Sequence, residues 1–106
     1  MGRFVIVACT PKAGKEALLH ALVEKHLRVL SAEQLVSDRP AHVMRAGDGT
    51  IVEVFEWLSP EAIERAHKSP AVDALWAELA AVCAYTPLAK LAECNTMFAE
   101  LESVSF

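Results

Sequence analysis

The predicted strands of this sequence carry apolar side chains on both faces, and this feature limits the fold more than any other. The segment RFVIVACT, residues 3–10, has one apolar set on each side of the pleat: Phe4, Ile6 and Ala8 against Val5, Val7 and Cys9. The segment TIVEVFEW, residues 50–57, is also apolar on both sides. Helices on one side cover only one face of a sheet, and monomers rarely expose a large apolar patch. With 54% hydrophobic residues, the excess must go to a second buried face, a ligand pocket or a partner subunit.

The first half of the chain predicts a strand, a long helix and a hairpin. Thr10 is expected to cap the helix, with Pro11 at its first position, and the helix should run to about Leu30. Its expected core stripe consists of Ala17, Leu18, Ala21, Leu22, Val29 and Leu30. AHVMRA, residues 41–46, predicts a short strand, and the GDG at 47–49 predicts a tight turn into the strand at 50–57.

Three further helix starts are marked in the second half by a Ser or Thr followed by Pro, the preferred capping pair. They lie at residues 59–60, 69–70 and 86–87, and the second of them opens a predicted helix over 71–85. The stripe of that helix is Val72, Leu75, Trp76, Leu79, Val82 and Cys83. NTMFAELESV, residues 95–104, predicts a final strand.

This order of elements, β-α-β-β-α-β, predicts an α+β fold of the ferredoxin-like type over a single domain, residues 1–106. Such a domain has a four-stranded antiparallel sheet with helices on one face. The apolar second face then predicts a homodimer, because packing two sheets face to face buries it. The expected assembly is a closed or nearly closed barrel made from two sheets.

Charge and cysteine content exclude several classes of protein. The net charge is −4, and the ten Lys and Arg residues form no basic stripe, so we expect no nucleic-acid partner and no membrane partner. The three cysteines form no close pair, which argues against a disulfide framework and against a zinc site. These features, and the absence of a signal-peptide pattern, predict a cytoplasmic protein with no metal.

The segment CTPKAGKE, residues 9–16, superficially resembles a phosphate-binding loop between a strand and a helix. A Walker-type loop needs Gly where Cys9 stands and a hydroxyl residue where Glu16 stands. The Glu16 carboxylate would also repel a phosphate group. The sequence therefore predicts no nucleotide at this loop, and we also expect no other cofactor.

The order of elements, the apolar second sheet face and the segment FEWLSPEAIERAHKSPAV, residues 55–72, resemble the dimeric α/β-barrel superfamily. The chain is most similar to the antibiotic-biosynthesis-monooxygenase-like group. That resemblance implies a ligand pocket within each subunit, between the sheet and the helices. Members of the superfamily include cofactor-independent oxygenases, haem-degrading enzymes and isomerases.

The resemblance and the residue types together suggest which side chains form the pocket. Trp57, at the end of a strand, matches a position that is often aromatic in the family and would stack a flat substrate, or fill the core. His67 is the candidate catalytic residue, because a histidine on the following helix could handle protons near neutral pH. His42 is a candidate substrate-binding residue on the second strand, whereas His20 and His26 are expected to be solvated.

Glu53 shares a strand face with Phe55 and Trp57, so all three are candidate substrate-binding residues. A buried Glu53 would have a raised pKa and could act as a base, but an ion pair with Arg45 across the hairpin is the favoured interpretation. Trp76 and Tyr85 are further candidates for the pocket, with core packing as the alternative.

Three functional hypotheses follow. The first is a monooxygenase-like enzyme that acts, without a cofactor, on a small flat apolar molecule. The second is a non-catalytic dimeric module that binds a small molecule or a protein partner. The third is a haem-binding protein with His67 or His42 as ligand, which the missing first-strand asparagine of haem-degrading relatives disfavours.

Overall fold

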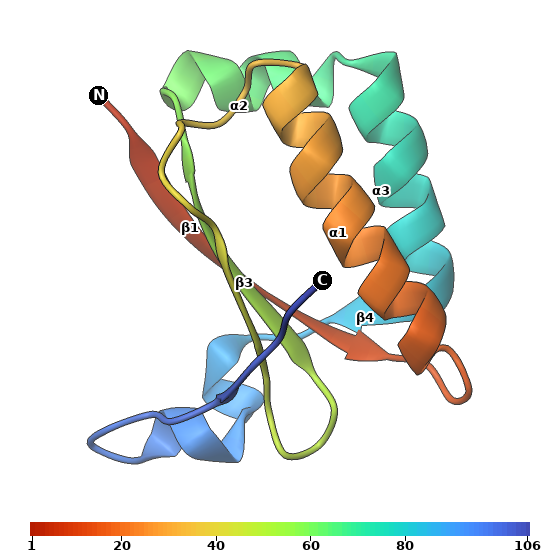
Figure 1. Cartoon of the computed structure of the whole chain (residues 1–106), viewed down its shortest axis with the longest axis vertical. Coiled ribbons are helices and arrows are strands. Elements are labelled where there is room, and N and C mark those ends of the chain that lie inside the picture. The colour runs from red at the N-terminus through yellow and green to blue at the C-terminus, as the bar shows by residue number, and fades with distance from the viewer.

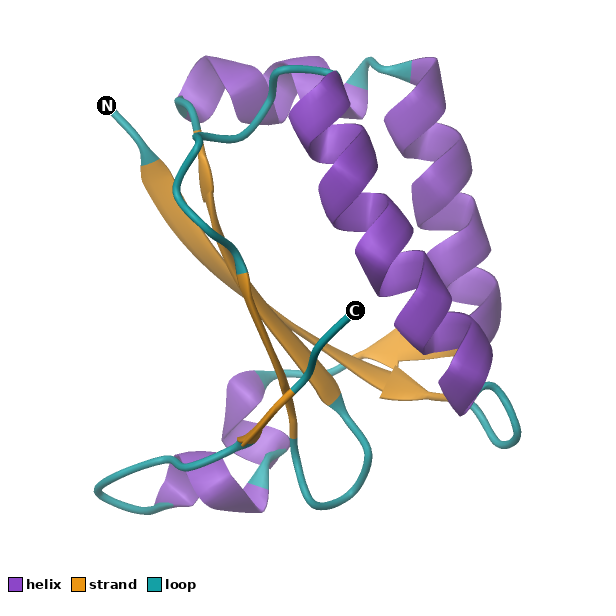
Figure 2. Cartoon of the chain, in the orientation of Figure 1, coloured by secondary structure: helices purple, strands orange, loops and turns teal.

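The computed structural model describes residues 1–106 and shows one antiparallel sheet with three α-helices on one of its faces (Figures 1 and 2). The strands are β1 (Arg3–Pro11), β2 (His42–Arg45), β3 (Ile51–Trp57), β4 (Cys83–Tyr85) and β5 (Glu102–Ser103). The α-helices are α1 (Glu16–Ala32), α2 (Pro60–His67) and α3 (Pro70–Val82). Two short 3-10 helices, η1 (Leu88–Lys90) and η2 (Ala92–Asn95), follow β4. The predicted α+β class with helices on one face is confirmed.

The strands lie in the order β4-β1-β3-β2-β5, and every neighbouring pair is antiparallel. The first four are compatible with a ferredoxin-like sheet. β1 and β3 form its centre, paired from Arg3 opposite Trp57 to Cys9 opposite Ile51. The edge strand β4 pairs with β1 only at residues 9–11 of β1. β1 is therefore paired on both edges over only a small part of its length.

The predicted start of the long helix is wrong. Thr10 belongs to β1, and its hydroxyl oxygen lies 2.8 Å from that of Thr50 and 2.6 Å from that of Thr86. Because Thr10 is used between strands, its hydroxyl does not cap a helix. The chain instead turns through Gly14, whose positive φ of 74° suits glycine, and α1 begins at Glu16.

The predicted hairpin and the two Ser-Pro helix starts are confirmed. Gly49 has a φ of 92°, and the backbone N–H of Thr50 donates to Oδ1 of Asp48 at 2.9 Å. The Ser59 hydroxyl accepts from the N–H of Ala62, and that of Ser69 accepts from the N–H of Val72. The third predicted helix is shorter than expected, because α3 ends at Val82 and residues 83–85 form β4.

The C-terminal region also differs from the prediction. The expected helix after Pro87 is replaced by η1 and η2, and the expected strand over 95–104 is reduced to β5, which pairs with Met44 and Arg45 of β2. The 3-10 helices lie across the sheet from the α-helices (Figure 1). Leu91 is buried there in a small cluster with Ala8, Ala46 and Val52. This segment covers part of the second sheet face that the sequence left uncovered.

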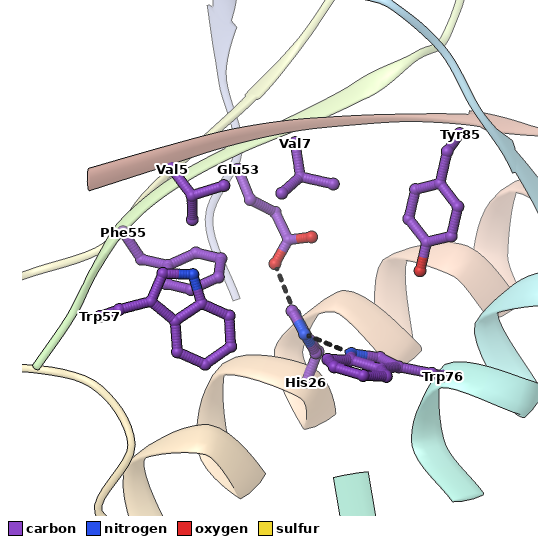
Figure 3. A pocket seen from close by; sticks show the side chains of 8 residues that line it. All are labelled: Val5, Val7, His26, Glu53, Phe55, Trp57, Trp76 and Tyr85. Atoms are coloured by element: carbon purple, nitrogen blue, oxygen red, sulfur yellow. Dashed lines mark hydrogen bonds and ion pairs between the residues drawn. The ribbon is translucent and has the colours of Figure 1, made fainter. Parts of the chain in front are cut away.

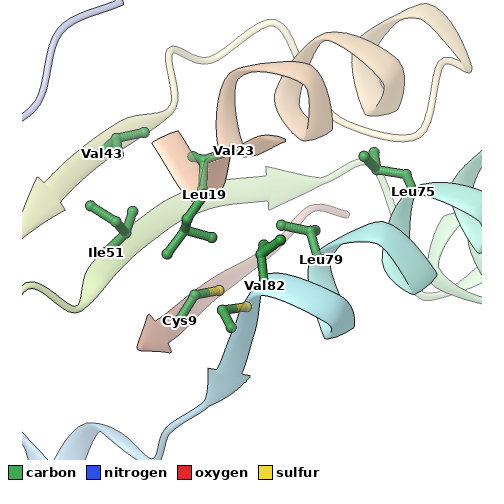
Figure 4. Close-up of a cluster of buried hydrophobic side chains, with 9 residues drawn as sticks. Cys9, Leu19, Val23, Val43, Ile51, Leu75, Leu79 and Val82 are labelled. Atoms are coloured by element: carbon green, nitrogen blue, oxygen red, sulfur yellow. The ribbon is translucent and has the colours of Figure 1, made fainter. Parts of the chain in front are cut away.

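The main core lies between the sheet and the pair α1 and α3 (Figure 4). It contains Cys9, Leu19, Val23, Val43, Ile51, Leu75, Leu79, Val82 and Cys83. The predicted stripe of α1 is largely wrong, because its buried residues are Leu19, Val23, His26 and Leu30, while Leu18 is exposed. The buried set has spacings of four, three and four residues, which keeps one helical face toward the sheet.

Part of the second sheet face remains exposed. Phe4 and Ile6 of β1 are 59% and 51% exposed, and Ile6 pairs with the half-buried Val54 of β3. The second face is therefore uncovered only in part. The apolar side chains that remain there form a smaller patch, here called the outer patch: Phe4, Ile6 and Val54. None of the helices combines the length and the apolar character needed to cross a membrane.

Candidate functional site: a histidine–glutamate pair in an aromatic cavity

A cavity of about 300 Å³ lies between the sheet and the helices (Figure 3). Its lining residues come from five elements: Val5 and Val7 of β1, His26 of α1, Glu53, Phe55 and Trp57 of β3, Trp76 of α3 and Tyr85 of β4. Most of this wall is aliphatic or aromatic. The volume is at the lower end of the range for small-molecule sites. The cavity therefore suits a small, mostly apolar ligand.

Two of the lining residues form a buried hydrogen-bonded pair. The Nδ1 atom of His26 lies 2.9 Å from Oε1 of Glu53, and the residues are 5% and 1% exposed. The Trp76 indole N–H donates to Nε2 of His26 at 3.4 Å. Because Nε2 accepts this bond, the neutral ring carries its hydrogen on Nδ1 and donates it to the Glu53 carboxylate. The only basic lone pair of His26 then points toward Trp76.

Regular secondary structure places this pair at the cavity wall. His26 lies on the inner face of α1, between Val23 and Leu30, so its side chain points toward the sheet. Glu53 is the only polar residue on the helix-facing side of β3, and Val7 of β1 lies directly opposite it. Both groups are fixed by packed elements, and no buried side-chain nitrogen or oxygen lacks a hydrogen-bond partner.

Aromatic rings surround the pair on two sides. The Phe55 ring meets His26 edge-on with a centroid distance of 5.8 Å, and it packs against Trp57 at 5.3 Å. Trp76 lies on the side of His26 away from Phe55 (Figure 3), and its ring centroid is 5.0 Å from that of His67 on α2. Aromatic side chains in this arrangement offer flat surfaces to a ligand.

Tyr85 adds a second polar group at the β4 side of the cavity. The residue is half-exposed, but its hydroxyl group is turned toward the helices (Figure 3). Burial, followed by the neighbouring Cys9, Cys83 and Glu53, raises the pKa of Tyr85 from 10.0 to about 12. The phenol is therefore protonated at neutral pH and can donate a hydrogen bond to a ligand oxygen.

The structure brings together five of the seven candidate site residues and leaves two outside. Lining the cavity are Trp57, Glu53, Phe55, Trp76 and Tyr85. His67 is exposed on α2 and is separated from the cavity by Trp76, which it contacts. His42 is exposed on β2, opposite Val54 of β3 and thus on the outer side of the sheet.

Two sequence-based expectations about charged partners are wrong. Arg45 does not pair with Glu53; it pairs at 3.3 Å with Glu102, the residue directly opposite it on the neighbouring strand β5. Glu53 pairs with His26, which is buried although it was expected to be solvated. His26 is the main site residue that sequence reasoning missed.

A signal for His26 is nevertheless present in the sequence. Leu19, Val23 and Leu30 form an apolar stripe with helical spacing, and His26 occupies the position of that stripe between Val23 and Leu30. Glu53 likewise stands alone on an apolar strand face. Two isolated polar residues on two apolar faces that pack together predict a buried pair.

The remaining reactive groups near the core do not add a nucleophile. Burial raises the pKa of the Cys9 thiol, with smaller contributions from Cys83 and Glu53, and burial also raises the pKa of Cys83. Both are therefore thiols rather than reactive thiolates at neutral pH. No three His, Cys, Asp or Glu side chains lie close enough together to hold a metal ion.

The chemistry available to this site is proton transfer in an apolar, aromatic cavity. His26 has a basic nitrogen on the cavity side and a carboxylate behind it, while Tyr85 provides a hydroxyl donor. This combination can bind a small flat molecule and accept a proton from it. In comparisons with known proteins, no protein-family model matches the chain, and no curated protein matches it.

Proposed function

We propose that this protein is a cofactor-independent enzyme that removes a proton from a small, flat, mostly apolar molecule bound between the sheet and the helices. The observation that carries this proposal is the buried His26–Glu53 pair in the wall of an otherwise apolar cavity. Replacing a buried polar pair with apolar residues is often neutral or stabilising. A role in chemistry explains the presence of this pair better than a role in folding.

His26 is the proposed general base and Glu53 the residue that orients it. The Nδ1–H bond to Glu53 fixes the ring so that the Nε2 lone pair faces Trp76 in the cavity wall. When Nε2 takes a proton from the ligand, the imidazole becomes positive, and the adjacent carboxylate stabilises that charge. Glu53 therefore favours the protonated product of the transfer over the neutral starting ring.

The charges around the cavity also restrict the ligand. Glu53 is a buried acid, and no Lys or Arg lines the cavity. An anionic ligand would meet an unfavourable potential and would lose its hydration without a cationic partner. We therefore expect a neutral ligand whose acidic hydrogen meets His26, with an oxygen that Tyr85 can hydrogen-bond as negative charge develops on it.

The resemblance to the monooxygenase-like group suggests that the deprotonated ligand then reacts with O2. Deprotonation makes the bound ligand electron-rich, so that it can itself reduce O2. A methylene group next to an activating carbonyl or ring would become a carbonyl. One atom of O2 becomes the carbonyl oxygen, and the other leaves as water with the two methylene hydrogens. All four electrons then come from the substrate, and no separate reductant is needed.

The proposal includes a homodimer formed through the outer patch. Phe4 and Ile6 are large apolar side chains that stand exposed on the central strand β1, next to Val54. A second copy packed against this face would bury them in a symmetric interface, as expected for the dimeric α/β-barrel superfamily that the sequence resembles. The 3-10 helices cover the neighbouring part of the face and would form the border of that interface.

A non-catalytic binding module is the second candidate, and one observation favours it. Both nitrogens of His26 have partners inside the protein, Glu53 and Trp76, so the pair needs no ligand to satisfy its hydrogen bonds. In such a module the cavity would hold its ligand without changing it. The two candidates differ in whether a bound ligand exchanges its acidic hydrogen.

Hydrogen–deuterium exchange of 2-tetralone tests the proposal. This two-ring neutral ketone has an acidic C–H next to its carbonyl, and NMR in D2O follows the loss of that hydrogen. We expect the wild-type protein to accelerate exchange above the buffer rate, His26→Gln to lose the acceleration, and the control His67→Gln to keep it. Binding without exchange would identify a binding module. Equal rates for wild type and His26→Gln would remove His26 as the base, and oxygen uptake with the same ketone tests the oxygenase step.

A further inference from the structure

We infer that the Trp76 indole N–H occupies Nε2 of His26 when no ligand is bound, and that a hydrogen-bond donor on the ligand replaces this indole N–H. The site is then selective for neutral ligands that carry an acidic O–H or N–H, including the enol form of a ketone, because only these donors can take the place of the indole. This inference rests on the proposed function and names the ligand class of the same site. Trp76 acts here as a positioning and selectivity residue.

The geometry around His26 is the first support. The two bonds to its ring differ in length: Nδ1 is 2.9 Å from Glu53, whereas Nε2 is 3.4 Å from the Trp76 indole nitrogen. A nitrogen–nitrogen distance of 3.4 Å is beyond the usual range for a good hydrogen bond, so the Trp76 bond is the weaker one. A ligand donor that approaches Nε2 more closely would form a better bond than the one it displaces.

The way the two tryptophans are held is the second support. Trp57 is 7% exposed and packs against Phe55 and the apolar cluster that includes Leu30, Leu35 and Val72. Trp76 is only partly buried, and its outer contact is the exposed ring of His67. Trp76 also packs against both main apolar clusters, but of the two indoles in the cavity wall it is the less buried and therefore the freer to rotate.

Selectivity follows from what a ligand without a donor would do. If such a ligand pushed Trp76 aside, Nε2 would be buried without a partner, and that arrangement is unfavourable. If it left Trp76 in place, it could not reach the base. A ligand with a donor suffers neither penalty, and its acidic hydrogen arrives at the atom that is to accept it.

Binding of two matched naphthalenes to three proteins tests this inference. 2-Naphthol carries a donor, and 2-methoxynaphthalene has nearly the same shape without one. Trp76→Phe keeps an aromatic wall but removes the indole N–H, and Trp57→Phe is the control that alters the other indole. We expect Trp76→Phe to raise the affinity ratio of naphthol to methoxynaphthalene about fivefold, the size of one modest hydrogen bond. Trp57→Phe should leave that ratio unchanged.

A second measurement on the wild-type protein does not depend on the Trp76 variant folding. The chain has two tryptophans, so its proton–nitrogen NMR spectrum has two indole N–H signals, and Trp57→Phe identifies which is which. Addition of 2-naphthol should shift the Trp76 signal, whereas 2-methoxynaphthalene should shift it much less.

An unchanged ratio in Trp76→Phe, or a Trp76 signal that responds equally to both compounds, would show that Trp76 is only part of the wall. The inference would then fail even if His26 still catalysed exchange of 2-tetralone. Failure of both naphthalenes to bind the wild type would also overturn it. The tetralone test decides the proposed function separately.

Discussion

The Nδ1 atom of His26 lies 2.9 Å from Oε1 of Glu53, so that α1 and β3 share a hydrogen bond inside the apolar layer between helices and sheet. The pair depends on both elements, because neither residue has a polar neighbour on its own buried face. Removal of either partner therefore has a different consequence from removal of both.

Glu53→Leu should lower the free energy of unfolding by about 1–3 kcal/mol, because the Nδ1–H of His26 is left buried without an acceptor. The double variant His26→Leu/Glu53→Leu should unfold at a free energy equal to or above that of the wild type, because no polar group is then left unpaired. Urea denaturation of the wild type, both single variants and the double variant measures this coupling. If the double variant lost as much stability as the two single variants together, the pair would be structural and the functional explanation would lose its support.

Tyr85 should ionise well above the usual range for a tyrosine. Its pKa is raised from 10.0 to about 12, mainly by burial, and a raised pKa means that the fold favours the protonated phenol. The resulting stability is fully present below pH 10 and is lost as the pH rises toward 12. Because the chain has a single tyrosine, the absorbance of tyrosinate reports on this residue alone, with circular dichroism to monitor folding. A midpoint near 10 in the folded protein would mean that the hydroxyl faces water rather than the cavity.

Ile6→Glu should convert the proposed dimer into a monomer. Ile6 is 51% exposed in the outer patch, and a carboxylate there would be buried without a partner in a face-to-face dimer. Leu18→Glu is the matched control, since Leu18 is 50% exposed on α1, away from the outer patch. Light scattering after size-exclusion chromatography gives the mass of each variant. A wild type that is already monomeric, or an Ile6→Glu protein that remains dimeric, would contradict the proposed interface.

The two Ser caps should differ in their contribution to stability. Ser59 accepts one bond from the Ala62 N–H, whereas Ser69 accepts from Val72 and also donates to Oε1 of Glu33 at 2.9 Å. Ser59→Ala should cost about 1 kcal/mol and Ser69→Ala about 1–2 kcal/mol in the free energy of unfolding. Ser31→Ala, an exposed position inside α1, serves as the control and should be close to neutral. The reverse order of the two costs would mean that the Glu33 bond adds nothing.

The class of fold and much of the cavity could be predicted because the relevant signals are local. Ser-Pro pairs start α2 and α3, the GDG turn joins β2 to β3, and strand alternation places Glu53, Phe55 and Trp57 on one face. These features depend on neighbouring residues in the chain. They remain valid whatever the distant parts of the molecule do.

The errors arise where a distant contact overrides a local preference. Thr10 looks like a helix cap, but its hydroxyl bonds Thr50 and Thr86, which come from other parts of the sequence. Residues 83–85 continue a helical pattern, yet they extend to pair with β1. The sequence of α1 alone predicts a solvated His26, since it does not show the carboxylate of Glu53 on β3 that stabilises the buried ring. In each case the deciding partner is outside any window that a periodicity argument considers.

The short pairing of β4 has a consequence for how a ligand enters. β4 is an edge strand that contacts β1 over three residue pairs only, yet it carries Tyr85, which forms one wall of the cavity. Local opening of this strand breaks few hydrogen bonds and leaves the β1–β3 centre intact, so its backbone amides should exchange with deuterated solvent earlier than those of β3. A ligand held between Tyr85 and the helices would slow that exchange. The exchange rate of the backbone amides of residues 83–85 would then report whether the cavity holds a ligand, even for a compound that undergoes no reaction.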